Sequence, residues 1–197
     1  VALTVAPRRE HNPVSPAQKR LWFVCQFTQA GGSYLIPAQF DIQGQLEPGV
    51  LCQAIDILVA RHEILRSQYL QDDNSELFMK IAAPVTGVCR YTDLSGMAPA
   101  QCQAQLESIA QSNAGKAFDL SADLMLRADL VLLAPEHHVL LLCLHHIVAD
   151  GWSMELLFNE LSALYQQLLQ GQQPDARPER LQYLDYTCHL QQSEQQL

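Results

Sequence analysis

Two adjacent histidines, His145 and His146, have the residue types and the setting that chemistry would require. They follow a run of six apolar residues, 139–144, which predicts a strand buried on both faces. In an extended chain the two imidazoles point to opposite faces, so one can enter the core while the other faces a cleft. An imidazole in a cleft can exchange a proton near neutral pH. The pair therefore predicts a functional histidine at the end of a central strand.

An aspartate and a glycine follow the histidine pair. Gly151 permits a tight turn, because glycine adopts backbone conformations that a side chain forbids. Asp150 is placed either to hold that turn or to orient one of the histidines. From residue 152 onward, apolar residues recur at helical spacing and predict a long amphipathic helix.

The composition is that of an ordinary globular domain. The 197 residues are 48% hydrophobic and 17% charged, which is enough for one domain with a sizeable core. The net charge of -9 argues against nucleic acid or an acidic membrane surface as a partner, and no apolar run is long enough to span a bilayer. The six cysteines fit no zinc-ligand spacing, so we expect reduced thiols, no metal site and a cytoplasmic protein.

The remaining elements must position the histidine pair. The predicted helices begin at Pro16, Pro48, residue 97, residue 152 and about residue 179. The predicted strands cover residues 34–42, 61–70, 77–82, 88–93, 125–133 and 137–144. This order mixes hairpins with separate helices, so we expect an α+β two-layer sandwich with helices packed on a mainly antiparallel or mixed sheet. At the turn before the last strand, His137 and His138 are expected to be solvated.

Four stretches resemble the N-terminal half of a condensation domain of a nonribosomal peptide synthetase. The first motif, residues 15–22, matches S-x-A-Q-x-R-L-W, and the second, residues 61–69, matches R-H-E-x-L-R-T-x-F with two conservative differences. The third, residues 145–153, matches H-H-x-x-x-D-G-x-S. The fourth, residues 183–186, matches Y-x-D-Y, with His189 where the family usually has tryptophan. Because all four occur in the family's order, the resemblance is specific.

The resemblance implies a chloramphenicol-acetyltransferase-like lobe. In this family two such lobes form a V, and the reaction site lies in the tunnel between them. The chain ends soon after the fourth motif, so we expect residues 1–197 to be the N-terminal lobe with the C-terminal lobe absent. Such a lobe is expected to be inactive alone.

The implied reaction forms an amide bond between two thioesters in antibiotic or secondary-metabolite biosynthesis. An acyl or peptidyl group on a donor carrier protein is attacked by the amine of an aminoacyl group on an acceptor carrier protein. Both groups are tethered through phosphopantetheine arms, and the thioester is already activated. The resemblance therefore implies no bound cofactor and no metal. The expected partners are the two peptidyl carrier proteins and the missing lobe.

The same resemblance gives roles to the residues of the second and third motifs. His146 is the candidate catalytic residue: it chiefly orients the attacking amine and also accepts its proton, a step worth roughly 10²–10⁴-fold. His145 is expected to be buried and hydrogen-bonded. Asp150 is expected to hold the turn through a charge-assisted hydrogen bond to Arg61 or Arg66.

The residues that follow Gly151 receive mainly structural roles. Trp152 and Ser153 are expected mainly to shape the start of the long helix. Both are also candidates to line the channel, and Ser153 lies close in sequence to His146. In the fourth motif, Tyr186 is expected to pack along its helix, and Asp185 is expected to be a polar residue of the surface.

Other functions remain open at this point. An epimerisation domain shares the paired histidines and the aspartate, but Gly151 and the first motif favour condensation. A heterocyclisation domain is disfavoured because aspartate replaces its first histidine. A coenzyme-A-dependent acyltransferase lobe fits the fold, although the second motif argues against it. A different class is a scaffold or carrier-docking fragment without catalysis.

Overall fold

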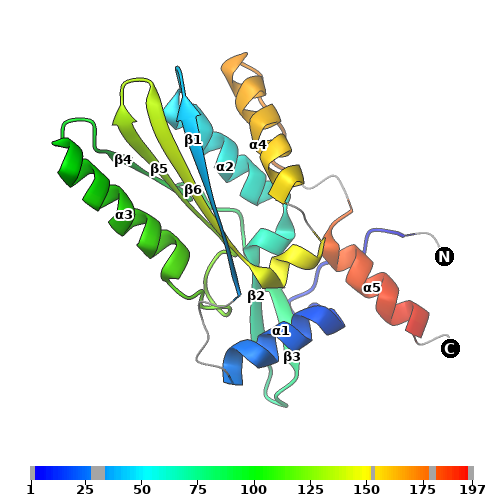
Figure 1. Ribbon diagram of the computed structural model, residues 1–197. Coiled ribbons are helices and arrows are strands. Elements are labelled where there is room, and N and C mark those ends of the chain that lie inside the picture. Colours follow the sequence, from blue (N-terminus) through cyan, green and yellow to red (C-terminus); the bar gives the residue numbers. More distant parts are fainter. Residues whose placement is uncertain (1–2, 28–33, 152–153, 178–180, 195–197) are drawn as a thin grey trace.

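A computed structural model describes residues 3–27, 34–151, 154–177 and 181–194 (Figure 1). For residues 149–151 and 194 it describes the backbone alone. Two sheets and five α-helices make up this part of the chain.

The larger sheet has four strands in the order β1-β6-β5-β4. Their bounds are Leu35–Gln43 for β1, His137–His145 for β6, Leu126–Ala134 for β5 and Cys89–Asp93 for β4. Strand β6 pairs antiparallel with both β1 and β5, whereas β4 runs parallel to β5. The prediction of a central strand that ends in the histidine pair is confirmed, because β6 is hydrogen-bonded along both edges.

Helices cover both faces of this sheet (Figure 1). The helices α2, Pro48–Arg61, and α4, Met154–Leu169, lie on one face, and α3, Pro99–Gly115, lies on the other. The predicted α+β class and mixed sheet are confirmed. The two-layer description accounts for only one face, since the structure adds a helical layer on the second.

The reason for the second helical layer is the apolar run of β6. Leu140 and Leu142 belong to the core beneath α2 and α4, while Val139 and Leu141 belong to a smaller core against α3. Alternate residues of a strand point to opposite faces, so an uninterrupted apolar run needs cover on both sides.

The smaller sheet is the predicted hairpin of β2, Ser67–Gln71, and β3, Leu77–Ile81. The prediction of one strand over residues 61–70 is wrong at its beginning, because a 3₁₀ turn, η1 (Glu63–Arg66), precedes β2. The physical reason is the buried Arg66, whose guanidinium returns to the last turn of α2. It donates to the carbonyl oxygens of Val59 (3.1 Å) and Ala60 (2.9 Å), which would otherwise be unpaired at that helix end.

Helix α1, Pro16–Phe27, begins with reciprocal hydrogen bonds in its first turn. The backbone N–H of Gln18 donates to Ser15 Oγ (3.1 Å), and the N–H of Ser15 donates to Gln18 Oε1 (2.9 Å). This arrangement is a capping box and confirms Ser15 as the N-cap. Both side chains also reach distant motifs: Ser15 Oγ lies 3.0 Å from Tyr183 Oη, and Gln18 Nε2 donates to Tyr69 Oη (3.2 Å). The first motif therefore binds the second and the fourth.

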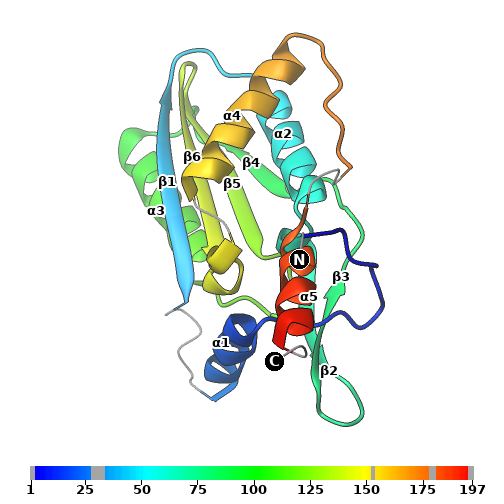
Figure 2. The same ribbon diagram turned by 90° about the vertical axis from the view of Figure 1, so that its right-hand side faces the viewer.

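The N-terminal segment runs beside helix α5, Tyr183–Glu194 (Figure 2), and a buried carboxylate of α5 joins the two. Asp185 is 1% exposed and accepts hydrogen bonds from Arg8 Nη1 (2.6 Å), Ala6 N–H (2.8 Å) and Gln182 N–H (2.7 Å). Arg8 also forms an ion pair with Glu63 of η1 (2.8 Å). Burial alone would raise the pKa of Asp185, but these hydrogen bonds outweigh it and hold the pKa below its usual range. The interpretation of Asp185 as a polar residue of the surface is wrong, because its side chain is buried.

Removal of this carboxylate should destabilise the fold. We predict that Asp185→Ala lowers the free energy of unfolding by about 2–4 kcal/mol, because two backbone N–H groups lose their acceptor and Arg8 loses one of its two carboxylate partners. Urea unfolding followed by circular dichroism measures the change. The matched control is Asp73, an exposed aspartate in the turn between β2 and β3. Asp73→Ala should shift the unfolding free energy by less than about 0.5 kcal/mol. Equal losses in the two variants would contradict this role of Asp185.

Candidate functional site

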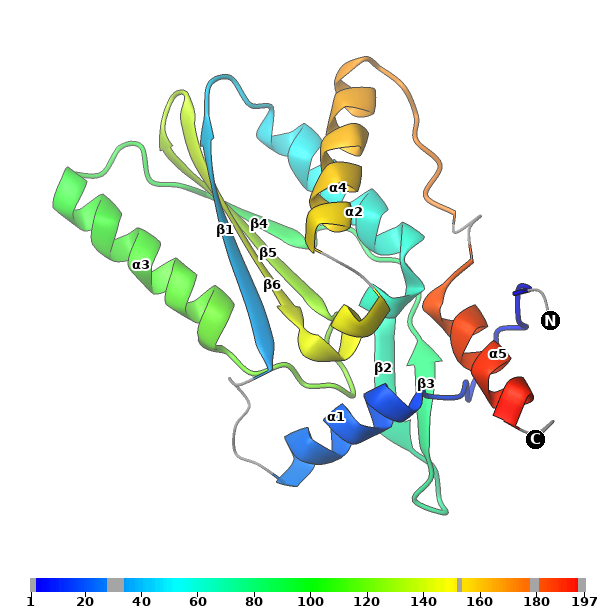
Figure 3. The same ribbon diagram turned by 45° about the vertical axis from the view of Figure 1, so that its right-hand side comes forward.

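The chain leaves β6 at His145 and turns at once into a 3₁₀ segment, η2 (His146–Gly151). His145 is 3% exposed, whereas the side chain of His146 is exposed. The predicted division, with one imidazole inside and one outside, is confirmed. Figure 3 shows η2 beside α1, and the backbone N–H of His146 donates to the carbonyl oxygen of Tyr34 (2.8 Å), just before β1. His146 thus lies on a turn whose first peptide group is fixed by a neighbouring segment.

His145 is surrounded by groups from three other parts of the chain. Its Nδ1 accepts the backbone N–H of Ile147 (3.0 Å), and its Nε2 lies 3.7 Å from Cys25 Sγ on α1. The edge of its ring meets Phe118, with centroids 6.0 Å apart and an interplanar angle of 88°. The prediction that His145 is buried and hydrogen-bonded is confirmed.

Burial, with a smaller contribution from the charge of His146, lowers the pKa of His145 to about 4. At neutral pH this imidazole is uncharged, and its lone pair at Nδ1 already accepts a backbone hydrogen bond. A group in this state holds the turn and does not exchange protons with a substrate. Of the two imidazoles, only that of His146 is exposed to solvent.

The two arginines of the second motif have partners other than the histidine turn. In addition to its two α2 carbonyls, Arg66 donates to the carbonyl oxygen of Ala82 beyond β3. Arg61 donates to the carbonyl oxygen of Asp175 (2.7 Å) and forms an ion pair with Glu160 of α4 (3.3 Å). These contacts fasten the C-terminal end of α2 to its surroundings.

Part of the third motif falls outside the described residues. Only the backbone of Asp150 and Gly151 is described, and Trp152 and Ser153 lie outside the described ranges. The pairing of Asp150 with Arg61 or Arg66 therefore stays a prediction, as does the lining of a channel by Trp152 and Ser153.

Cys25 is a neighbour of the histidine pair that the motifs do not contain. The signal that could have found it is its helical spacing, because Gln18, Trp22 and Cys25 are separated by four and then three residues. Residues at that spacing share one helix face, and the structure places this face toward the core. A cysteine on that face can reach the buried histidine.

The other histidine pair differs from its prediction. His138 is 2% exposed, and neither ring nitrogen has a hydrogen-bond partner within the described part of the chain. Burial lowers its pKa. His138 belongs to β6 and points to the same face as Leu140 and Leu142, so the alternation of the strand carries it inward. His137 points the other way, and its Nε2 lies 2.5 Å from Oδ1 of Asp41 on β1.

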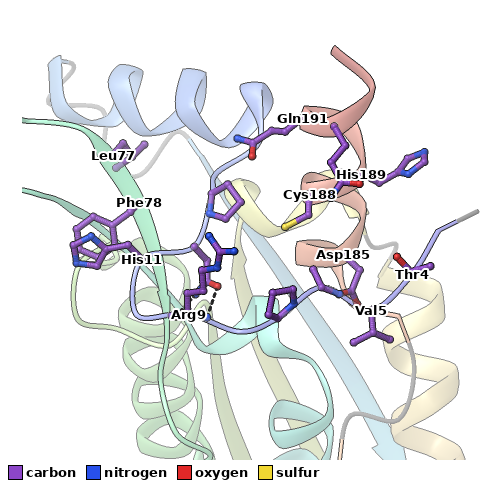
Figure 4. A pocket seen from close by; sticks show the side chains of 15 residues that line it. Thr4, Val5, Arg9, His11, Leu77, Phe78, Asp185, Cys188, His189 and Gln191 are labelled. Carbon is purple, nitrogen blue, oxygen red and sulfur yellow. Dashed lines mark hydrogen bonds between the residues drawn. The ribbon is translucent and has the colours of Figure 1, made fainter. Parts of the chain in front are cut away.

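A groove of about 530 Å³ lies on another part of the surface (Figure 4). The N-terminal segment, β3 and α5 line it, with Arg9, His11, Phe78 and His189 among its side chains. Neither His145 nor His146 borders this groove. The groove and the histidine turn are therefore separate features. The buried carboxylate of the groove, Asp185, is already paired with Arg8.

Metal binding and membrane insertion find no support in the described ranges. No group of three or more His, Cys, Asp and Glu side chains there is placed to hold a metal ion. No helix among them is long and apolar enough to cross a membrane.

Comparison with known sequences relates this geometry to a protein family. The family model described as "Condensation domain" matches residues 8–197. The chain is 35% identical to malpinin synthetase of Mortierella alpina over 188 residues, which is 95% of this chain and 2% of that protein. It is 33% identical to the dimodular nonribosomal peptide synthase of Bacillus subtilis (strain 168) over 190 residues, which is 96% of this chain and 8% of that protein.

Solved structures show the same lobe. The X-domain from teicoplanin biosynthesis superimposes with a TM-score of 0.82 and 26% identity, covering 99% of this chain and 41% of that one. The first condensation domain of the calcium-dependent antibiotic synthetase gives a TM-score of 0.71 and 26% identity, covering 84% and 40%. The predicted lobe fold is confirmed, and the chain spans about two fifths of these structures.

The buried state of His145 predicts a specific pH dependence. Its pKa is about 4 in the folded protein and about 6.5 in an unfolded chain, so only the unfolded state takes up the proton between these values. The contribution of His145 to the free energy of unfolding is complete above pH 6.5 and falls by about 3 kcal/mol as the pH drops to 4. Unfolding of the wild type and of His145→Gln across this range measures it.

The difference between the two proteins isolates His145 from the other titrating groups. The advantage of the wild type over His145→Gln should shrink toward acid pH, because the variant lacks the imidazole that takes up a proton only in the unfolded state. A wild-type advantage that is constant from pH 7 to 4 would contradict a neutral buried His145.

Proposed function

The chain belongs to the condensation-domain family, and on that premise we propose that it supplies the His146 half of a site that joins two carrier-bound thioesters through an amide bond. The observation that carries the proposal is the exposure of His146 on a turn held by buried structure. This arrangement offers an imidazole to a substrate while His145 stays inside.

The proposed reaction needs one nucleophile and one proton acceptor. The α-amino nitrogen of the acceptor substrate attacks the carbonyl carbon of the donor thioester, so a C–N bond forms and the C–S bond breaks. An α-amino group has a pKa near ~8, so a useful fraction is uncharged at neutral pH. The nitrogen still loses a proton as the bond forms. His146 orients this amine and accepts the proton, which the leaving thiolate of the donor phosphopantetheine finally receives.

Positioning is the larger contribution under this proposal. Two substrates held end to end react with effective molarities of about 10⁵ M or more, provided that the reacting atoms are already aligned. The turn suits that task, because the N–H of His146 is bonded to Tyr34 and the N–H of Ile147 to the ring of His145. The phosphopantetheine arms of the donor and acceptor carrier proteins would deliver the substrates, and a second lobe would close the opposite side of the tunnel.

A partner-docking role is the second candidate, and one comparison favours it. The X-domain from teicoplanin biosynthesis has been solved in complex with OxyB, and that structure superimposes on this chain with a TM-score of 0.79 and 27% identity. A lobe of the same fold can therefore serve in a complex with another protein. Under this candidate the chain binds carrier proteins and His146 plays no chemical part.

Substitution of His146 tests the catalytic proposal. In the two-lobed domain, His146→Ala should lower the rate of dipeptide formation by roughly 10²–10⁴-fold, because the amine loses its orienting group and proton acceptor. Loaded carriers are supplied, and the dipeptidyl thioester is measured by mass spectrometry. His137→Ala is the matched control at the opposite end of β6, where the imidazole pairs with Asp41, and it should leave the rate unchanged.

Each outcome separates the two candidates. An undiminished rate in His146→Ala would remove the catalytic role. Carrier binding without product in the wild-type domain would support docking instead. If the rate falls, a pH profile that keeps its shape in the variant indicates positioning, and loss of the acid limb indicates proton transfer.

A further inference from the structure

The hydrogen bonds of His145 determine which of its nitrogens carries the proton. A backbone N–H can only donate, so Nδ1, which receives the N–H of Ile147 at 3.0 Å, must present its lone pair. The buried imidazole is neutral, because burial keeps its pKa well below neutral pH. A neutral ring carries one N–H, and in His145 that N–H is therefore at Nε2.

The N–H at Nε2 points to Cys25. The sulfur of Cys25 lies 3.7 Å from Nε2, within the range of a hydrogen bond to sulfur. Burial raises the pKa of the Cys25 thiol, so it remains protonated and accepts through a sulfur lone pair. A buried N–H without an acceptor is costly, so this contact favours the Nε2–H tautomer over its alternative.

We propose that Cys25 is a positioning residue for His146 and acts through the tautomer of His145. Cys25 holds the proton on Nε2, which leaves Nδ1 free to accept the N–H of Ile147. Ile147 is the residue after His146, so this bond fixes the turn that presents the exposed imidazole. The catalytic part of the inference rests on the function proposed above, whereas the tautomer does not.

The surroundings of the ring make this route specific. Phe118 meets the ring edge-on and hinders its rotation, so Cys25 and Ile147 remain opposite the correct nitrogens. Arg127 in turn steadies Phe118, because its guanidinium lies 4.2 Å from the centre of that ring. If the tautomer changed, Nδ1–H would face the N–H of Ile147, two donors in contact, and the turn would have to move.

Two substitutions at residue 25 separate the acceptor from the volume it fills. Cys25→Ala removes the acceptor, whereas Cys25→Ser keeps one in nearly the same place. Nitrogen-15 NMR of histidine-labelled chain reports the protonated nitrogen of His145 directly. We expect the Nε2–H form in the wild type and in Cys25→Ser, and a substantial Nδ1–H population in Cys25→Ala.

The second measurement is the rate of dipeptide formation in the two-lobed domain. Cys25→Ala should lower this rate about tenfold, less than the roughly 100-fold that a misplacement of about 1 Å can cost, and Cys25→Ser should restore most of it. Cys188→Ala, at a half-buried thiol on α5, is the matched control and should change neither readout. Circular dichroism confirms that each variant is folded.

The inference is overturned if His145 keeps its Nε2–H form in Cys25→Ala, or if the tautomer changes while the rate does not. Equal losses in the Ala and Ser variants would also overturn it, because the volume of the side chain would then matter and not its acceptor. A wild-type domain that forms no dipeptide would defeat the proposed function, yet the NMR result would still decide the role of Cys25 in the tautomer.

Discussion

Strand β6 is hydrogen-bonded along both edges and apolar on both faces, and this double burial constrains the rest of the lobe. Because no face of the strand tolerates water, α2 and α4 must cover one side and α3 the other. The strand then has one direction in which to leave the core, at its C-terminal end, where η2 begins. The exposed imidazole therefore follows directly from the central strand of the sheet.

The four motifs are far apart in sequence, but several of their side chains hold the lobe together. Hydrogen bonds connect Ser15 with Tyr183 and Gln18 with Tyr69, while Arg8 binds both Glu63 and Asp185. Each of these contacts crosses between elements that are remote along the chain. Three of the motifs thus act chiefly as supports, and the third carries the group that is offered to solvent.

The histidine pair divides two tasks that one residue would perform poorly. A proton acceptor must meet a substrate, so it must be accessible, whereas a residue that fixes a turn gains from burial and a defined tautomer. His145 has the second set of properties and His146 the first. The chain spans about two fifths of the solved relatives, and the proposed tunnel needs a second surface facing His146.

The sequence by itself determined the features that depend on local spacing. The apolar run predicted the central strand, alternation predicted one buried and one exposed histidine, and Ser15 before Pro16 predicted the first helical turn. The tertiary structure alone decided the contact of Cys25 with His145 and the burial of Asp185. It also decided the 3₁₀ turn at Glu63–Arg66, because the partners of Arg66 and of these other side chains come from separate elements. Periodicity records which way a side chain points, but the group that it meets depends on how distant elements pack.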